Sequence, residues 1–139
     1  MIPPRSPYGL IQEDLWPDEH KILVACMLLN CTTRKQVEKV IPKLFRMWPD
    51  AHAMSEADPE QLASAISTLG FKNRRAASLI KMSKCYVTKN WKHAKELPGI
   101  GEYAAGAWEI FCRQSMPQNC PPDHALKYYY NWRKSHAKS

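Results

Sequence analysis

Residues 96–104 read Glu-Leu-Pro-Gly-Ile-Gly-Glu-Tyr-Ala, and this stretch decides the fold. Pro98 cannot continue a helix, while Gly99 and Gly101 permit positive φ angles through a tight turn before a helix of small residues begins. Such a turn directs consecutive backbone N–H groups and a helix N-terminus out of the protein, a geometry that binds phosphate without side-chain charge. If only the Pro-Gly dipeptide were present, a simple turn between two helices would explain it. The full Leu-Pro-Gly-Ile-Gly sequence, placed after a helix, favours phosphate binding.

The sequence around this turn predicts an all-α bundle of six to eight short helices. No segment alternates apolar and polar residues, and no Asn-Gly or Asp-Gly hairpin turn occurs, so strands are not expected. Pro42 falls inside one expected helix and predicts a kink or a restart there. The first expected helix covers 18–30 and is apolar on every side, and the second is capped by Thr32 or Thr33 and ends before Pro49. Further helices are expected from Asp58 to Gly70, over 73–89, over 101–113 and after Asp123.

Length and composition narrow the class of protein. The 139 residues predict one domain spanning 1–139, and 45% apolar with 24% charged residues is typical of a globular protein. The longest apolar run, residues 22–29, is far shorter than the roughly 20 residues that span a bilayer. The first residues lack a secretory apolar segment. Five cysteines form an odd number without a C-x-x-C pair, which predicts a reduced, intracellular protein with no metal site.

The positive charge is concentrated in the second half of the chain. Residues 71–139 carry thirteen Lys and Arg but four Asp and Glu, whereas residues 1–70 carry seven and nine. One strongly basic half of a folded domain is typical of a surface that binds a polyanion. A solvated lysine-rich face that keeps the protein soluble is an equal alternative on charge alone.

The stretch from Leu97 to Gly101 resembles the helix-hairpin-helix motif of a DNA glycosylase superfamily. Members of this superfamily also carry an aspartate downstream of the motif. Within the superfamily, the chain is similar to the glycosylase domains of the methyl-CpG-binding protein 4 type, which act on thymine or uracil mismatched with guanine. The resemblance implies a compact bundle of short helices with a cleft and with the hairpin at about 92–113. The other matching stretches are 3–7 and 10–13 as the entry segment, 21–30 as the first core helix, 69–71 as the strand-penetrating loop, and Asp123-His124 as the catalytic stretch.

The resemblance implies that Asp123 is the catalytic residue. A helix over 101–114 is about 21 Å long, and residues 115–122, with three prolines, can stretch over about 26 Å. The chain can therefore return and place Asp123 beside the hairpin. A carboxylate near C1′ stabilises the oxocarbenium-like sugar cation that forms when the N-glycosidic bond breaks. Asp123 is also a good N-cap for the helix expected after it, and the two roles can coexist.

The resemblance also implies base-pocket and DNA-binding residues. Gln12 and Tyr103 match positions that line the pocket for an everted base, with a surface glutamine and a core-edge tyrosine as the alternatives. Phe71 occupies the position of the wedge that fills the vacated stack, with a core phenylalanine as the alternative. Cys31 stands where mammalian relatives carry an arginine next to the DNA. The full set is Leu10, Ile11, Gln12 and Tyr103 for the pocket, and Cys31, Thr32, Phe71, Lys72, Arg74, Lys95, Leu97, Pro98, Gly99, Ile100 and Gly101 for DNA.

Two further features indicate the branch of the superfamily. Tyr103 stands where bifunctional members carry the lysine that forms a Schiff base, so we expect a monofunctional enzyme. No cysteine follows Cys120, so an iron–sulfur cluster with four cysteine ligands beyond Asp123 is not expected. The backbone of the hairpin can hold a monovalent cation.

The sequence therefore predicts a monomeric, nuclear glycosylase that removes thymine or uracil from G·T or G·U mismatches in double-stranded DNA. A helix-hairpin-helix module that binds DNA without catalysis is the alternative from another class. A relative specific for adenine or for oxidised bases is a weaker alternative, because such relatives usually carry a cluster or a hairpin lysine.

Overall fold

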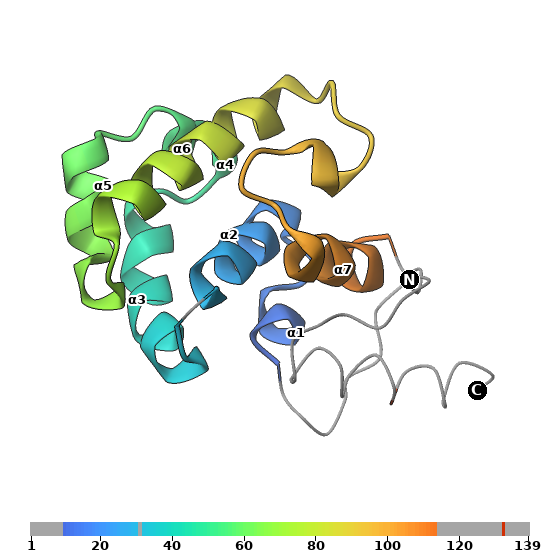
Figure 1. Ribbon diagram of the computed structural model, residues 1–139, viewed down its shortest axis with the longest axis horizontal. Coiled ribbons are helices and arrows are strands. Elements are labelled where there is room, and N and C mark those ends of the chain that lie inside the picture. The colour runs from blue at the N-terminus through green and yellow to red at the C-terminus, as the bar shows by residue number, and fades with distance from the viewer. Residues whose placement is uncertain (1–9, 31, 114–131, 133–139) are drawn as a thin grey trace.

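The computed structural model describes residues 10–30, 32–113 and 132, and within them the chain is helical with no strand. The all-α prediction is confirmed (Figure 1). The expected helix after Asp123 lies outside the described residues. The elements are α1 (Ile11–Leu15), α2 (Glu19–Leu29), α3 (Arg34–Met47), α4 (Ala51–Ser55), α5 (Pro59–Ala65), the 3-10 turn η1 (Ser67–Leu69), α6 (Lys72–Thr88), the 3-10 turn η2 (Ala94–Glu96) and α7 (Glu102–Phe111).

Helix α2 is the centre of the bundle, as its all-round apolar sequence predicts. Figure 1 shows it between α3 on one side and α7 on the other, with α6 above it. Asp18 caps its first turn by accepting a hydrogen bond from the Lys21 backbone N–H at 3.0 Å. Residues on every side of α2 are buried, from Ile22 through Leu28 with the exception of Met27. The helix therefore forms a core against which four other helices pack.

Helix α3 runs through Pro42 without the restart that the sequence suggested. A proline removes the hydrogen bond to the carbonyl four residues earlier, here that of Glu38. Both Pro42 and Glu38 are exposed, so water can satisfy the freed carbonyl and the helix continues to Met47. Its N-cap is Thr33, whose hydroxyl accepts from the Gln36 N–H in a capping box.

The segment before α6 differs from the single helix expected up to Gly70. Helix α5 ends at Ala65, and the 3-10 turn η1 carries the chain on to Gly70, which has φ +81°. Phe71 follows with φ +49°, and α6 begins directly after it. Two successive residues with positive φ turn the chain sharply, and for Phe71 this left-handed backbone is unfavourable.

Glu19 at the start of α2 links the two helices that form the walls of the site described below. Its Oε1 accepts a hydrogen bond from the Tyr86 hydroxyl of α6 at 2.8 Å. Its Oε2 accepts one from the Trp108 indole N–H of α7 at 2.7 Å. Burial, together with the hydrogen bond to Glu19, raises the pKa of Tyr86, so this hydroxyl keeps its proton and remains a donor. None of the helices that the structure describes is long and apolar enough to span a membrane.

Candidate functional site

The turn at Leu97–Gly101 joins the 3-10 turn η2 to α7, so the hairpin has one 3-10 turn where its first helix was expected. Gly99 adopts φ +83°, whereas Gly101 has φ −92° and serves as the N-cap of α7. The expectation that both glycines use positive φ is therefore wrong for Gly101. The side chains of Leu97 and Ile100 are buried and fix the turn to the core, and the Ile100 N–H donates to the Leu97 carbonyl at 3.3 Å within the turn.

The two glycines have different surroundings. A Cβ atom on Gly99 would lie 2.8 Å from the Cε atom of Met27 in α2, so a side chain would fit there only if this terminal methyl group moved. A Cβ atom on Gly101 would meet nothing within 4 Å. The first glycine thus lets the turn pack closely on α2, while the second leaves open space in front of the N-terminus of α7.

Side chains on both sides of the turn hold its entry in place. The Glu96 carboxylate accepts hydrogen bonds from the backbone N–H groups of His93 at 2.7 Å and Lys92 at 2.8 Å, which lower the pKa of Glu96. His93 Nδ1 accepts from the Lys95 N–H at 3.1 Å, so the ring proton resides on Nε2 and is donated to Glu109 of α7 at 2.8 Å. The entry to the turn is therefore attached to the helix that follows it.

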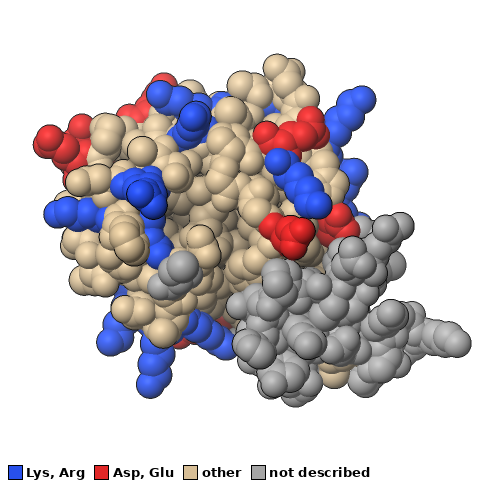
Figure 2. Space-filling model, in the orientation of Figure 1, with Lys and Arg blue, Asp and Glu red and all other residues tan. Residues whose placement is uncertain are grey.

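A cleft of about 740 Å³ opens beside the turn, between α2, the start of α6 and the start of α7. Figure 2 shows this face of the molecule, with an uncharged hollow in the middle, Lys and Arg side chains to its left and several Asp and Glu side chains to its right. The described residues that line the cleft are Cys26, Met27, Leu28, Asn30, Phe71, Arg74, Arg75, Ser78, Leu79, Gly99, Gly101, Glu102, Tyr103 and Ala104.

Tyr103 and Gln12, the two predicted pocket residues, are brought together by the fold. The Gln12 amide donates to the Tyr103 hydroxyl at 2.6 Å and to the Cys26 sulfur at 3.4 Å. Gln12 is 2% exposed, which excludes a surface glutamine. Tyr103 and Cys26 line the cleft, whereas Gln12 lies behind them. Tyr103 of α7 therefore supplies a polar part of the cleft wall, and Gln12 of α1 holds its hydroxyl from behind.

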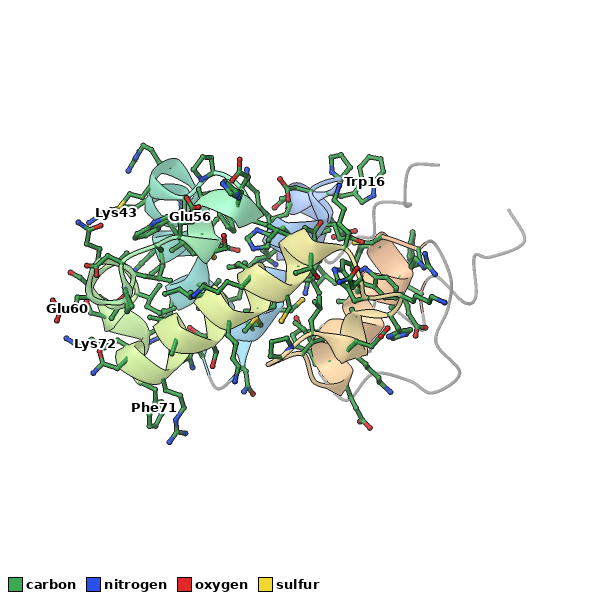
Figure 3. All side chains as sticks on the ribbon, turned by 90° about the horizontal axis from the view of Figure 1, so that it is seen from above. Trp16, Lys43, Glu56, Glu60, Phe71 and Lys72 are labelled. Atoms are coloured by element: carbon green, nitrogen blue, oxygen red, sulfur yellow. The ribbon has the colours of Figure 1, made fainter. Side chains whose placement is uncertain are left out.

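Phe71 is 71% exposed, which excludes the alternative of a core phenylalanine. Figure 3 shows it at the beginning of α6 beside Lys72, with its ring projecting away from the helix. The guanidinium of Arg74 lies 5.9 Å from the centre of the Phe71 ring. An exposed aromatic side chain at the rim of a cleft, on a residue with an unfavourable backbone conformation, is typical of a residue that contacts a binding partner.

Arg75 has a structural role that the sequence did not reveal. Its Nη1 donates to the Leu28 carbonyl at 2.9 Å and its Nη2 donates to the Asn30 carbonyl at 2.6 Å. Because these carbonyls lie at the C-terminal end of α2, Arg75 satisfies acceptors that the helix leaves unpaired. Arg75 thus ties α6 to α2 while its guanidinium keeps its positive charge.

The remaining predicted residues lie at the edge of the cleft, in the core or outside the described part of the chain. Leu10 and Ile11 are buried core residues that do not line the cleft, and Pro98, Lys72 and Lys95 lie outside its lining. Thr32 donates its hydroxyl proton to the Leu28 carbonyl. Cys31 and Asp123 lie outside the described residues. Glu102, which the sequence analysis did not select, adds a carboxylate to the cleft; its position directly after Gly101 could have indicated this.

The chain matches the model of the HhH-GPD superfamily of base excision DNA repair proteins over residues 24–136. The chain belongs to this superfamily. The match includes the hairpin, the cleft residues of α2, α6 and α7, and the segment that contains Asp123. The recognition made from the hairpin is therefore confirmed.

Curated relatives agree with this assignment. The chain is 40% identical over 131 residues to the methyl-CpG-binding domain protein 4-like protein of Arabidopsis thaliana, covering 94% of this chain and 29% of that one. It is 34% identical over 95 residues to the thymine-DNA glycosylase of Aeropyrum pernix, covering 63% of this chain and 43% of that one. The chain thus spans less than half the length of these relatives.

Solved structures share the fold. A thermostable thymine-DNA glycosylase superposes with a TM-score of 0.68 at 23% identity, covering 81% of this chain and 52% of that one. An endonuclease III trapped covalently on DNA superposes with a TM-score of 0.63 at 22% identity, covering 70% of this chain and 49% of that one. The HhH-GPD fold is therefore established for this chain.

Proposed function

We propose that this HhH-GPD chain is a monofunctional DNA glycosylase that removes thymine or uracil mispaired with guanine in double-stranded DNA and leaves an abasic site. The observation that carries the proposal is the Tyr103 hydroxyl, held by the buried Gln12 amide, in the wall of a cleft bordered by the glycine turn and Phe71. Proteins named thymine-DNA glycosylase and thymine/uracil-DNA glycosylase are among its relatives.

Each part of the cleft has a role in this reaction. The amides of Gly99 and Gly101 bind a phosphate of the strand that carries the target base, with α7 contributing its N-terminus, while the Ile100 N–H donates to the Leu97 carbonyl at 3.3 Å. The target nucleotide leaves the helix, at a cost of about a few kcal/mol that a mismatch lowers, and its base enters the cleft. The Tyr103 hydroxyl, which accepts from the Gln12 amide behind it, can donate its proton to a carbonyl oxygen of a pyrimidine. Phe71 fills the space that the base vacates.

Asp123 is the proposed catalytic residue. Its carboxylate would stabilise the developing positive charge at C1′ and align or deprotonate the attacking water. The bond from C1′ to the pyrimidine N1 breaks with its electron pair moving to the base, and water adds to C1′. An asparagine would keep the shape of this side chain and lose its charge.

Tyr103 supports the absence of a lyase step. A Schiff base requires a primary amine near C1′, and this position after the hairpin carries a phenol. We therefore propose that the product is an intact strand with an abasic site. We also propose that 1–139 acts as one domain and as a monomer on DNA, in the nucleus, and without an iron–sulfur cluster.

Incubation of the protein with a duplex containing one G·U or G·T pair, followed by alkali, tests this function. A nick at the mismatch that requires alkali is the expected result. Borohydride added during the reaction should trap no protein–DNA adduct, and Asp123→Asn should abolish the nick while leaving binding to the mismatched duplex largely intact. Mismatch binding without any alkali-dependent nick would instead identify a non-catalytic module. Undiminished turnover by the Asp123→Asn variant would remove this residue from the mechanism.

A further inference from the structure

Arg74 lines the cleft and has no hydrogen bond or ion pair with any residue that the structure describes. Its neighbour Arg75 differs, because two carbonyl groups at the end of α2 already occupy its guanidinium. A guanidinium has five N–H donors in a rigid plane and no acceptor. The donors of Arg74 are therefore available to a ligand in the cleft.

The position of Arg74 relative to Phe71 restricts what this ligand can be. The two residues are three positions apart at the start of α6, which places them on the same side of the helix. The guanidinium lies 5.9 Å from the centre of the Phe71 ring. If the ring enters the base stack, the guanidinium arrives beside the bases that flank it.

In the proposed reaction, the two walls of the cleft would face different DNA strands. The wall made by Gly99, Gly101 and Tyr103 would bind the phosphate and the everted base, both of which belong to the strand that carries the target. Phe71 and Arg74 belong to the other wall, formed by the start of α6. With Phe71 between the strands, Arg74 lies on the side of the complementary strand.

We propose that Arg74 binds the guanine left unpaired opposite the everted nucleotide and thereby sets the preference for guanine at that position. The inference rests on the proposed function. Guanine fits a guanidinium because O6 and N7 are both acceptors, and because O6 loses its partner when the pyrimidine leaves. Adenine carries an amino group in place of O6, and this donor cannot accept a hydrogen bond from a guanidinium. Arg74 is thus a specificity-determining residue separate from the pocket for the everted base.

Lys72 supplies a matched control. It is an exposed cation two residues earlier in α6, next to Phe71 but outside the cleft lining (Figure 3). An ammonium in that position attracts the phosphate backbone and does not recognise a particular base. Removal of either residue lowers the net charge by the same amount, so any difference between the two variants reports on base contact.

The test compares single-turnover uracil excision from three duplexes, in which uracil faces guanine, adenine or the abasic analogue tetrahydrofuran. Arg74→Ala should slow excision opposite guanine about ten- to a hundredfold, as expected for loss of one bidentate base contact. It should change the rate opposite tetrahydrofuran less than threefold. Arg74→Lys should behave like Arg74→Ala, because the planar fork is lost although the charge remains. Lys72→Ala should lower the three rates by a common factor.

A common loss on all three duplexes for Arg74→Ala, or no loss opposite guanine, would overturn the inference. Failure of the unmodified protein to release uracil from any duplex would overturn the proposed function instead. In that case, binding still tests Arg74, with two duplexes in which tetrahydrofuran lies opposite guanine or opposite a second tetrahydrofuran. Arg74→Ala should lower the affinity for the duplex with guanine and leave the affinity for the other duplex unchanged. An equal loss of affinity for both duplexes would reject the inference.

Discussion

A Cβ atom on Gly99 would lie 2.8 Å from the Cε atom of Met27, and the backbone of Gly99 has φ +83°. The glycine turn therefore packs closely on the central helix. Met27 could move its terminal methyl group, but the positive φ would remain unfavourable for any L-residue. We expect Gly99→Ala to lower the free energy of unfolding by about 1 to 3 kcal/mol. Urea denaturation measures this, and an unchanged midpoint would contradict the strained geometry.

Gly101→Ala is the matched substitution at the second glycine of the turn. Gly101 has an ordinary negative φ, and an added Cβ meets nothing within 4 Å, so the fold should tolerate alanine with a change below about 0.5 kcal/mol. The new methyl group would occupy the space in front of the α7 amides where a phosphate approaches. We expect DNA affinity to fall at least fivefold at constant stability. Fluorescence anisotropy with a labelled mismatched duplex measures it, and unchanged affinity would place the phosphate elsewhere.

Glu19 should contribute strongly to the stability of the cleft. Its two carboxylate oxygens accept from Tyr86 of α6 and Trp108 of α7. Glu19→Ala leaves the indole N–H of Trp108, a residue 2% exposed, without its acceptor. Because hydrogen bonds to charged groups contribute about 1.5 to 3 kcal/mol each, we expect a loss of about 2 to 4 kcal/mol.

Glu38 provides the control for this prediction. It forms an ion pair with Arg34 on the exposed face of α3, and surface pairs of this kind contribute little. Glu38→Ala should shift the midpoint of thermal unfolding by far less than Glu19→Ala. Equal shifts for the two variants would show that the link between α2, α6 and α7 is not important for stability.

Local sequence features predicted the parts of this fold that depend on neighbouring residues. Thr33 and Asp58 cap helices at the expected places, because a capping side chain bonds only to backbone two or three residues away. Asp18, expected in the first turn of its helix, is the N-cap instead. The all-round apolar character of 18–30 predicted the central helix. Pro98 and Gly99 predicted the turn, since φ restrictions are properties of single residues.

Other features depend on contacts between distant parts of the chain and were not predictable locally. The burial of Gln12 follows from its bond to Tyr103, which is 91 positions away. In the sequence, Arg75 cannot be distinguished from the other cations, and only the fold places it against the end of α2. The 3-10 turn η1 replaces the last turn of an expected helix before Gly70. The position of Asp123 relative to the cleft remains a prediction from chain length and family resemblance.

Tyr103→Phe tests the polar wall of the cleft. The substitution removes the hydroxyl that accepts from the Gln12 amide at 2.6 Å and leaves the Cys26 sulfur, a weak acceptor, as its remaining partner at 3.4 Å. We expect a stability loss of about 1 kcal/mol, typical of one buried hydrogen bond. Uracil excision should fall about tenfold or more under single-turnover conditions, since a hydrogen bond to the base is lost as well. A stable variant with full activity would exclude Tyr103 from base recognition.

His20 should make the fold sensitive to mild acid. Its ring is 4% exposed, Nε2 lies 2.9 Å from Ser83 Oγ, and Nδ1 is buried with no hydrogen-bond partner among the described residues. Burial lowers the pKa of His20 from 6.5 to about 4, although the charges of Asp18 and Asp50 oppose the shift. Between these two values the unfolded chain binds a proton that the folded protein does not. Stability is therefore lost as the pH falls from 6.5 towards 4.

This loss should reach about 3 kcal/mol at pH 4, at 1.36 kcal/mol per pKa unit. Urea denaturation at intervals between pH 7 and pH 4 should show it in the unmodified protein, and His20→Phe should remove that part of the slope. His52 is the control, because its side chain is 74% exposed beside Glu56 and His52→Gln should retain the slope. Carboxylates contribute equally to all three proteins, so the difference between their curves isolates His20. Parallel curves for the unmodified protein and His20→Phe would show that the buried imidazole accepts a proton as readily as an exposed one.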